Sequence, residues 1–274
     1  MNRPASASPD ADRGADLDAA WFEPVRRWAV PSDPRPAGRI DLAVLNRFAA
    51  TRGVRIEDGL PLRFVEARQA SAAAYEGSIG ESGTVPTRAC GPGMLHDWFN
   101  ALAWLAFPRI KARLNRLHCD ALVVDAGTGE RRGAMRDAAT LLDENGVLFV
   151  CSDPALATSL RNRDWPALFV DGRERFAAGV TVRVLGHGLC EKLLAPYKAI
   201  CAHAWTVELL PDSPVGCLDD ALDAAVARQL CPDTLRAASL CPLPLLGVPG
   251  WWPANAEPAF YDDPSVFRRE RRER

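Results

Sequence analysis

One short segment of the sequence carries three side chains that could bind a metal ion or orient a substrate. His96 and Asn100 are four residues apart, so on a helix they share a face. Asp97 lies about 100° further round. An imidazole, a carboxylate and a carboxamide together suit metal binding or acid–base chemistry. Taken alone, the segment favours a structural role, because Asp97 suits the first turn of a helix and the other two could bond a neighbouring loop.

A second histidine stands between two glycines. His187 is predicted to follow a strand and open a helix, where the positive helix end favours a neutral ring, the form that ligates a metal or acts as a general base. Glu191 is one turn further on, so the two residues could chelate one ion. The pair lacks the second histidine of H-E-x-x-H, and a histidine that caps its own helix is the favoured alternative.

Carboxylates stand near both ends of another predicted helix. Asp143 and Glu144 would close it at the negative end of its dipole, so an arginine, a metal or water should lie beside them. Asp137, near the start, is expected on a partly buried face, where it would need an arginine partner.

These residues suggest an enzyme-like polar cleft. In this hypothesis a histidine acts as a base, or a divalent metal activates water, for hydrolysis of a small anionic substrate. The predicted catalytic residues are His96, Asp97, Asn100, Asp137 and His187, the predicted substrate-binding residues are Arg88, Arg109 and Arg136, and the predicted metal ligands are His187 and Glu191. The alternative is a non-catalytic binding or scaffold protein, in which the same residues form a structural hydrogen-bond network.

Other classes of function lack their signatures. No glycine-rich motif for a nucleotide or flavin is present, nor a G-x-S-x-G nucleophile elbow. None of the eight cysteines falls in a C-x-x-C pair. The formal net charge of -2 disfavours nucleic-acid binding by the whole surface.

The elements that must position the candidates follow from periodicity. An apolar stripe predicts a helix from Met94 to Phe107, with a second helix starting at Pro108. A glycine- and serine-rich loop is expected around Gly77–Gly83, and Asn145-Gly146 is expected as a helix C-cap. Further helices are predicted at Ile40–Ala50, Ala134–Glu144, Pro154–Arg161, His187–Leu194 and Leu218–Leu230, and strands at Val147–Val150, Ala167–Val170, Val180–Leu185 and Trp205–Leu210.

This alternation predicts an α/β (α+β) fold: a helix-rich single domain with a small mixed sheet and an extended, proline-rich C-terminal arm that wraps the body. We expect residues 1–18 to be a disordered leader, 19–267 the globular domain and 268–274 a frayed charged tail. The aromatic segment Trp21–Trp28 should dock, either on the body of its own chain or on a partner. No apolar leader opens the chain and Trp98–Phe107 is too short to span a bilayer, so a cytoplasmic protein is expected.

Several motifs together resemble the bacterial family known as domain of unknown function 3025, over about Trp21 to Arg268. The motifs are Val85-Pro86-Thr87-Arg88, His96-Asp97, Phe99-Asn100-Ala101-Leu102, Trp104-Leu105, Phe107-Pro108-Arg109, Arg136-Asp137-Ala138, Asp143-Glu144-Asn145-Gly146, Gly186-His187, Glu191-Lys192-Leu193-Leu194, Leu246-Gly247-Val248-Pro249-Gly250-Trp251, Phe260-Tyr261-Asp262-Asp263 and Val266-Phe267-Arg268. One departure is Leu95, where the family pattern has a tryptophan. The resemblance implies one shared architecture for these segments and no particular activity, cofactor or partner.

Overall fold

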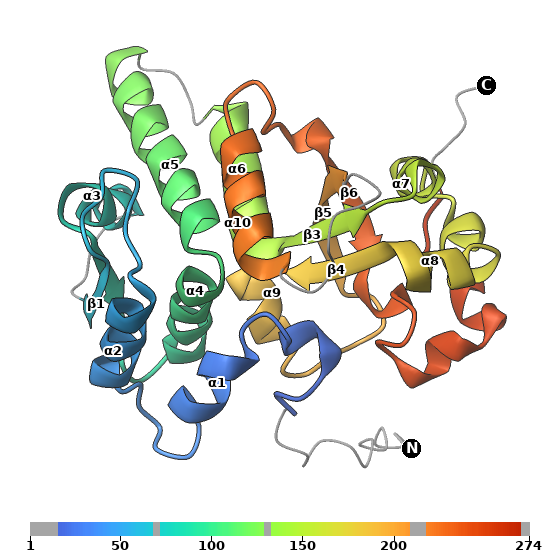
Figure 1. Cartoon of the computed structure of the whole chain (residues 1–274), viewed down its shortest axis with the longest axis horizontal. Coiled ribbons are helices and arrows are strands. Elements are labelled where there is room, and N and C mark those ends of the chain that lie inside the picture. Colours follow the sequence, from blue (N-terminus) through green and yellow to red (C-terminus); the bar gives the residue numbers. More distant parts are fainter. Residues whose placement is uncertain (1–15, 68–71, 129–132, 209–217, 270–274) are drawn as a thin grey trace, which may run out of the picture.

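The computed structural model describes residues 16–67, 72–128, 133–208 and 218–269. A four-stranded mixed sheet in the order β4-β3-β5-β6 forms one half of the molecule (Figure 1). Its strands are β3 (Gly146–Cys151), β4 (Val180–Val184), β5 (Cys201–Glu208) and β6 (Leu240–Pro244). β3 runs parallel to β5 and antiparallel to β4, and all six of its residues are buried. This burial explains its unbroken apolar sequence.

Helices make up the other half of the molecule. A small parallel pair, β1 (Arg63–Glu66) and β2 (Thr84–Thr87), is joined by α3 (Ala72–Ser82) and adjoins α2 (Leu42–Arg52). Next come α4 (Met94–Ala106) and α5 (Pro108–Thr128). Every residue of α4 from Trp98 onward is buried, as its nearly continuous apolar sequence requires.

Two elements of the sheet half bring it against the helical half. α6 (Ala134–Asn145) packs on α5 and leads directly into β3, and α9 (His187–Lys192) follows β4 and packs on both α4 and α6. α10 (Leu218–Gln229) also packs on α5, and in Figure 1 it is drawn in front of α6. The α+β class and the small mixed sheet are confirmed. No helix in the described parts of the chain is both long and apolar enough to cross a membrane.

The aromatic N-terminal segment docks on the chain's own body. It forms a 3₁₀ turn at Ala20–Phe22 and then α1 (Arg26–Ser32). Phe22 stacks on Phe99 with ring centroids 5.8 Å apart, and Trp98 Nε1 donates a hydrogen bond to Ser32 Oγ. Leu17 is already buried, so ordered packing begins inside the stretch predicted to be a leader.

The proline-rich C-terminal segment wraps the sheet half, but it begins with regular structure. β6 pairs with β5 at the sheet edge, a position where prolines are tolerated because their missing N–H faces away from the ladder. Three 3₁₀ turns follow, at Leu245–Gly247, Pro253–Ala256 and Pro258–Asp262. The hydroxyl of buried Tyr261 donates a hydrogen bond of 2.9 Å to the Gly247 carbonyl. This bond links the last of these turns to the first.

Of the remaining elements, α7 (Pro154–Arg161) lies where predicted and α8 (Arg173–Gly179) was not predicted. The strand predicted at Ala167–Val170 is wrong, since a π-helical turn occupies Pro166–Val170 and short apolar runs fit either structure. The strand predicted at Trp205–Leu210 begins earlier, at Cys201, and residues 209 and 210 lie outside the described chain.

One prediction based on glycine is also wrong. The loop expected at Gly77–Gly83 is mostly helix α3, where a side chain on Gly80 would lie 2.9 Å from Cys119 Sγ on α5. The glycine therefore permits close helix packing. The helix α6 does end at the predicted Asn145-Gly146 pair, with Gly146 as the C-cap residue, but the φ of -82° and ψ of 149° of Gly146 are extended and lead directly into β3.

Candidate metal centre

Two histidines and one glutamate from three separate helices meet at one point. His96 lies in the first turn of α4, His187 is the first residue of α9, and Glu144 lies in the last turn of α6. The two imidazole rings pack edge to face, with centroids 4.6 Å apart. Glu144 Oε1 lies 3.3 Å from His187 Nε2 and 3.8 Å from His96 Nε2. Within the described residues this is the one group whose ligand atoms could hold a metal ion together, all within 4.8 Å of one another.

The glycines that flank His187 make this approach possible. A side chain on Gly186 would lie 2.6 Å from the Glu144 carbonyl oxygen, so only glycine lets the start of α9 lie against the α6–β3 junction. A side chain on Gly188 would lie 2.6 Å from Glu144 Oε2, so this glycine leaves the space that the carboxylate occupies. The Gly-His-Gly segment therefore places the imidazole and makes room for its neighbour.

Each imidazole has a second carboxylate on its other nitrogen. His96 Nδ1 lies 3.1 Å from Glu191 Oε2, and His187 Nδ1 lies 3.8 Å from Asp143 Oδ2. The latter nitrogen is buried and has no hydrogen-bond partner among the described residues. Histidines that bind metals usually present their second ring nitrogen to a carboxylate or carbonyl, which fixes the ring orientation.

A buried lysine extends the polar contacts into the core. The Lys111 side chain is 4% exposed, and its ammonium donates to Asp143 Oδ1 over 2.5 Å and to Asn100 Oδ1 over 2.8 Å. Asn100 in turn donates to the Tyr75 hydroxyl over 2.6 Å. The positive partner expected beside Asp143 is therefore Lys111 rather than an arginine.

Both carboxylates of the α6 terminus are held in the ionised form. Burial raises the pKa of Asp143, but the charges of Lys111 and His187 and the lysine hydrogen bond outweigh it and leave the pKa below its ordinary value. Burial likewise raises the pKa of Glu144, and the hydrogen bond and charge of His187, with the charge of His96, bring the pKa below normal. The centre thus carries negative charge that suits a cation.

A further acidic group lies deeper, beside the lysine. Burial raises the pKa of Glu76 to about 7, against the hydrogen bond from Asn115 and the charge of Lys111. Burial also raises the pKa of Tyr75 well above its ordinary value. Glu76 thus holds its proton far more readily than the two carboxylates at the end of α6.

Of the predicted site residues, the structure brings together His96, His187, Glu191 and, through Lys111, Asn100. His96 and Asn100 face the same set of polar contacts, as their spacing predicts. Glu191 lies against His96 rather than forming an ion pair with His187 within the described chain. The reason is that His187, at the first position of α9, turns toward the end of α6.

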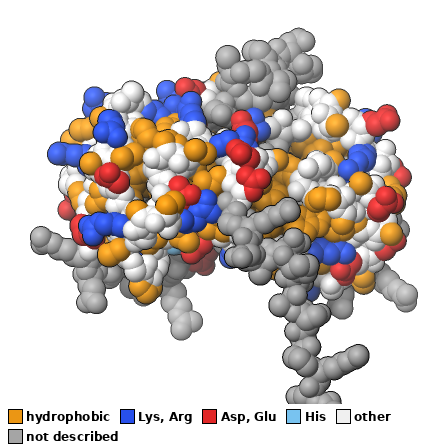
Figure 2. Space-filling view, turned by 90° about the horizontal axis from the view of Figure 1, so that it is seen from below, with side chains coloured by type: hydrophobic (Ala, Val, Ile, Leu, Met, Phe, Trp, Pro, Cys, Tyr) orange, Lys and Arg blue, Asp and Glu red, His pale blue; other side chains and the backbone are white. Residues whose placement is uncertain are grey.

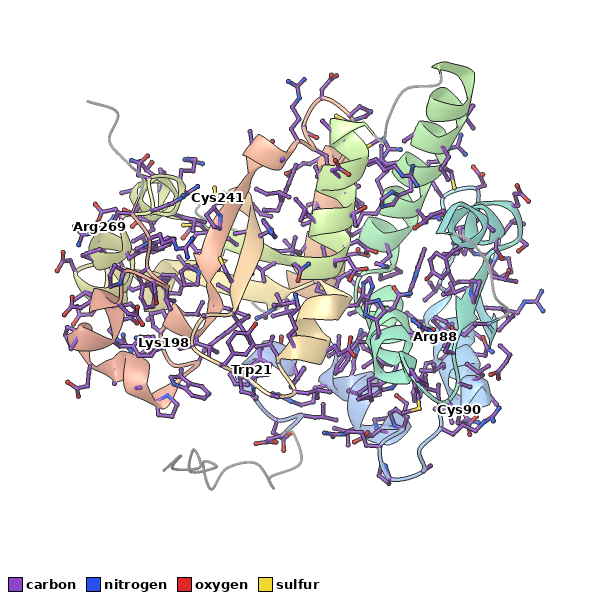
Figure 3. All side chains as sticks on the ribbon, turned by 180° about the vertical axis from the view of Figure 1, so that it is seen from behind. Trp21, Arg88, Cys90, Lys198, Cys241 and Arg269 are labelled. Carbon is purple, nitrogen blue, oxygen red and sulfur yellow. The ribbon has the colours of Figure 1, made fainter. Side chains whose placement is uncertain are left out.

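Asp97 is turned away from the histidines and binds Arg88. It accepts hydrogen bonds from the Arg88 backbone N–H, Nε and Nη2 at 2.6, 2.9 and 2.7 Å. Arg88 lies in the connection from β2 to α4, close to the start of that helix (Figure 3). The bidentate pair holds this connection in place.

The remaining predicted residues lie elsewhere. Asp137 is exposed, not partly buried as predicted, and it stands six residues, about 9 Å of helix rise, from Asp143. Arg136 is half-buried and lies near Glu76, whose pKa its charge lowers. Arg109 faces α10, where it lies 3.7 Å from Asp223.

Three polar residues near the centre, Lys111, His118 and Glu144, were not among the predicted site residues, although the sequence contains some indication of each. Lys111 and His118 flank Leu114 at positions i and i+7 of the stripe that α5 buries, and an ionisable residue on a buried helical stripe needs a partner. Glu144 was recognised only as a carboxylate in need of a positive neighbour, because no motif spacing links it to a histidine 43 residues further along.

Comparison with known proteins identifies the family and no further relative. No curated protein and no solved structure matches this chain. The family described as "Protein of unknown function (DUF3025)" matches residues 62–271. This range contains His96, Glu144, His187 and every polar residue in contact with them, whereas α1 and α2 precede it. The match spans well over half of the sequence, and the chain therefore belongs to the DUF3025 family.

Proposed function

We propose that this protein is a metal-dependent hydrolase in which His96, His187 and Glu144 hold one divalent transition-metal ion. One observation carries the proposal: two imidazole Nε2 atoms and one carboxylate oxygen converge, while a second carboxylate lies on the far side of each ring. A structural hydrogen-bond network requires no such convergence of three ligand atoms.

Two of the three distances between these atoms are close to those of a bound site, and the third is no more than 4.8 Å. Ligands held at about 2.0–2.1 Å from one metal, with angles of roughly 90–110°, lie about 2.9–3.4 Å from each other. The 3.3 Å between Glu144 Oε1 and His187 Nε2 falls in this range. The 3.8 Å to His96 Nε2 requires a shift of about half an ångström, which a side chain in the first turn of a helix can make.

The ligand types favour Zn²⁺ or Fe²⁺. Two imidazoles and one carboxylate are the protein ligands of hydrolytic zinc sites and of non-haem iron sites, whereas Mg²⁺ and Ca²⁺ prefer oxygen ligands alone. Three protein ligands leave a coordination position for water, which a zinc ion makes acidic enough to deliver hydroxide near neutral pH.

The other residues of the centre have supporting roles in this proposal. Glu191 and Asp143 orient the two rings, and Lys111 holds Asp143 in place. The side chains of His96 and Glu144 are 30% and 35% exposed, so a substrate can reach them from solvent. The predicted anionic substrate has less support, because Arg88 is bound to Asp97 and Arg109 faces α10, away from the centre. All described cysteines are free thiols, which supports our expectation of a reducing, cytoplasmic setting.

The alternative function is a non-catalytic scaffold, and one observation favours it. Lys111 already satisfies Asn100 and Asp143, and Glu191 already lies in hydrogen-bond reach of His96, without any ion. In that case the polar contacts specify how α4, α6 and α9 pack. Metal binding separates the two functions directly.

The experiment is a titration of the EDTA-treated full chain with Co²⁺ and Zn²⁺. We expect one equivalent of Co²⁺ to give visible d–d absorption of a site with nitrogen and oxygen ligands, displaced by Zn²⁺ but not by Mg²⁺ or Ca²⁺. Glu144→Gln and His187→Ala should abolish it. His203→Ala is the matched control, because His203 lies in β5 outside the group of ligand atoms.

Hydrolysis is then assayed with p-nitrophenyl acetate and bis(p-nitrophenyl) phosphate, with Zn²⁺ and with EDTA. Activity that requires the metal and disappears in Glu144→Gln supports the proposal. Absence of metal binding in the wild type, or equal binding in Glu144→Gln, overturns it in favour of the scaffold.

A further inference from the structure

A second polar site lies on the other side of α5 from the metal centre. Lys111, which faces the centre, and Arg109 are two residues apart, which places them about 200° from each other around the helix. On the Arg109 side, a groove of about 770 Å³ is lined by residues from the end of α2, the segment that follows it, the start of α5 and α10. Five arginines line it: Arg52, Arg55, Arg109, Arg113 and Arg228.

The charge of this groove is opposite to that of the chain. Its lining includes only two carboxylates, Glu57 and Asp220, against the five guanidinium groups. The sequence as a whole has a formal net charge of -2. On the face drawn in Figure 2, by contrast, basic and acidic side chains are scattered among one another. The groove lining therefore carries a formal excess of three positive charges.

The arginines divide into two groups by their contacts. Arg52 pairs with Asp220 at 2.6 Å and Arg113 pairs with Glu57 at 3.2 Å, so these two have partners within the groove. Arg55 and Arg228 are both exposed.

Neither of these two exposed arginines forms an ion pair within the described chain. Arg55 donates only to the Gly59 carbonyl, over 2.7 Å. Arg228 has no side-chain hydrogen bond among the described residues. Arg109 is 58% exposed along its side chain; its Nη1 lies 3.7 Å from Asp223 Oδ2 and donates a long hydrogen bond, 3.4 Å, to the Asp220 carbonyl. Three guanidinium groups can therefore turn toward a ligand without breaking a close ion pair.

A contact between two helices holds one end of the groove together. Buried Asp223 on α10 accepts the backbone N–H groups of Arg109 and Ile110, at 3.0 and 2.9 Å, and so caps the start of α5 from another helix. This contact ties α10 to α5 and holds Arg109 in position. Below the arginines the lining includes small apolar residues, Ala112, Ala224 and Ala227, which leave room for a ligand.

We propose that this groove binds a small phosphorylated molecule through Arg55, Arg109 and Arg228. Guanidinium groups match phosphate oxygens in charge and in paired hydrogen-bond geometry. The volume lies within the range of small-ligand sites. A small ligand fits better than nucleic acid, because Glu57 and Asp220 within the groove would repel a continuous phosphate backbone and the chain has no overall basic excess. This inference is independent of the proposed metal centre.

The test is isothermal titration of the full chain with inorganic pyrophosphate and with ADP, in EDTA so that neither can be held through a metal. We expect saturable binding that weakens as NaCl rises. The double variant Arg55→Ala/Arg228→Ala should raise the pyrophosphate Kd by about tenfold or more, because each lost hydrogen bond from a charged group contributes strongly to the free energy of binding. Both residues are exposed and form no ion pair within the described chain, so circular dichroism should show an unchanged fold. Tighter binding of ADP than of pyrophosphate would identify a nucleotide as the ligand class.

The control is Arg47→Ala/Arg63→Ala, which removes the same charge from exposed positions outside the groove. This variant should bind pyrophosphate as the wild type does. Equal weakening in both double variants would overturn the proposal, because it would show a non-specific charge effect. Binding of a single-stranded oligonucleotide without any binding of pyrophosphate or ADP would also overturn it, in favour of a nucleic-acid surface.

Discussion

Replacement of Gly188 by alanine should damage the metal centre without unfolding the protein. The added methyl carbon would lie 2.6 Å from Glu144 Oε2, so the carboxylate must retreat by about 0.8 Å to reach an ordinary contact near 3.4 Å. Metal sites tolerate errors of only about 0.2 Å in ligand position. We expect Zn²⁺ affinity to fall by roughly 10–100-fold, which is the loss seen when residues that orient a metal ligand are replaced.

Fold stability should move little in the same variant. Glycine within a helix is about 0.8–1.0 kcal/mol less favourable than alanine, and this gain offsets the strain of moving one partly exposed carboxylate. Urea unfolding of the metal-free variant should therefore agree with the wild type within about 1 kcal/mol. Affinity is measured by competition with a chromophoric zinc chelator.

The control is Gly133→Ala, at the start of α6, where a side chain would meet nothing within 4 Å. It should bind Zn²⁺ as the wild type does. Wild-type affinity in Gly188→Ala would refute the reasoning, since Glu144 could then not be a ligand in the position described. Loss of affinity together with a large loss of stability would refute it too, by showing a packing defect.

Other predictions concern the buried polar groups. Lys111→Met leaves Asp143 buried without its partner and should lower the unfolding free energy by about 3–5 kcal/mol in urea titrations; a change below 1 kcal/mol would show that water replaces the lysine. Asp223→Ala removes the cap of α5 and should destabilise by about 1–2 kcal/mol, whereas Asp223→Asn, which keeps one acceptor, should recover part of this. Because burial raises the pKa of Glu76 from 4.5 to about 7, the folded chain keeps a proton that the unfolded chain releases, and this group's contribution to stability falls as pH rises through that window. The free energy of unfolding of the wild type, relative to that of Glu76→Gln, should therefore fall by up to about 3 kcal/mol between pH 4.5 and 8. If the difference in unfolding free energy between the two proteins does not depend on pH, the raised pKa is contradicted.

Most of the elements could be predicted from periodicity or from unbroken apolar runs, since the first indicates an element with one buried face and the second an element buried on all sides, such as β3. The helices α4, α6, α7 and α10 and the strands β3 and β4 lie close to their predicted ranges. The failures share a cause, which is that tertiary contacts override local preference. Gly80 favours a loop in isolation but allows α3 to approach α5, and Pro242 sits in a strand because that strand is at a sheet edge.

The candidate site was predictable only in part. His96 and His187 could be singled out because each sits in a distinctive local segment. Their meeting could not be derived, since it depends on how α9 packs against α4 and α6. Asp137 shows the opposite limit: it was expected on a partly buried face of α6, but it is exposed, whereas the next two residues, Ala138 and Ala139, are buried.

The three ligand residues come from distant parts of the chain, and this has a consequence for folding. Glu144 follows His96 by 48 residues and precedes His187 by 43, so the ligand set is complete only after two long loops have closed. An ion held there would act as a reversible cross-link between three helices. It would bind the native state and not the unfolded chain, and would slow unfolding in proportion to its concentration. When a chelator is added in excess, an ion released during a separation of α4, α6 and α9 would not bind again. The rate at which the chain then becomes sensitive to protease would report how often these helices separate.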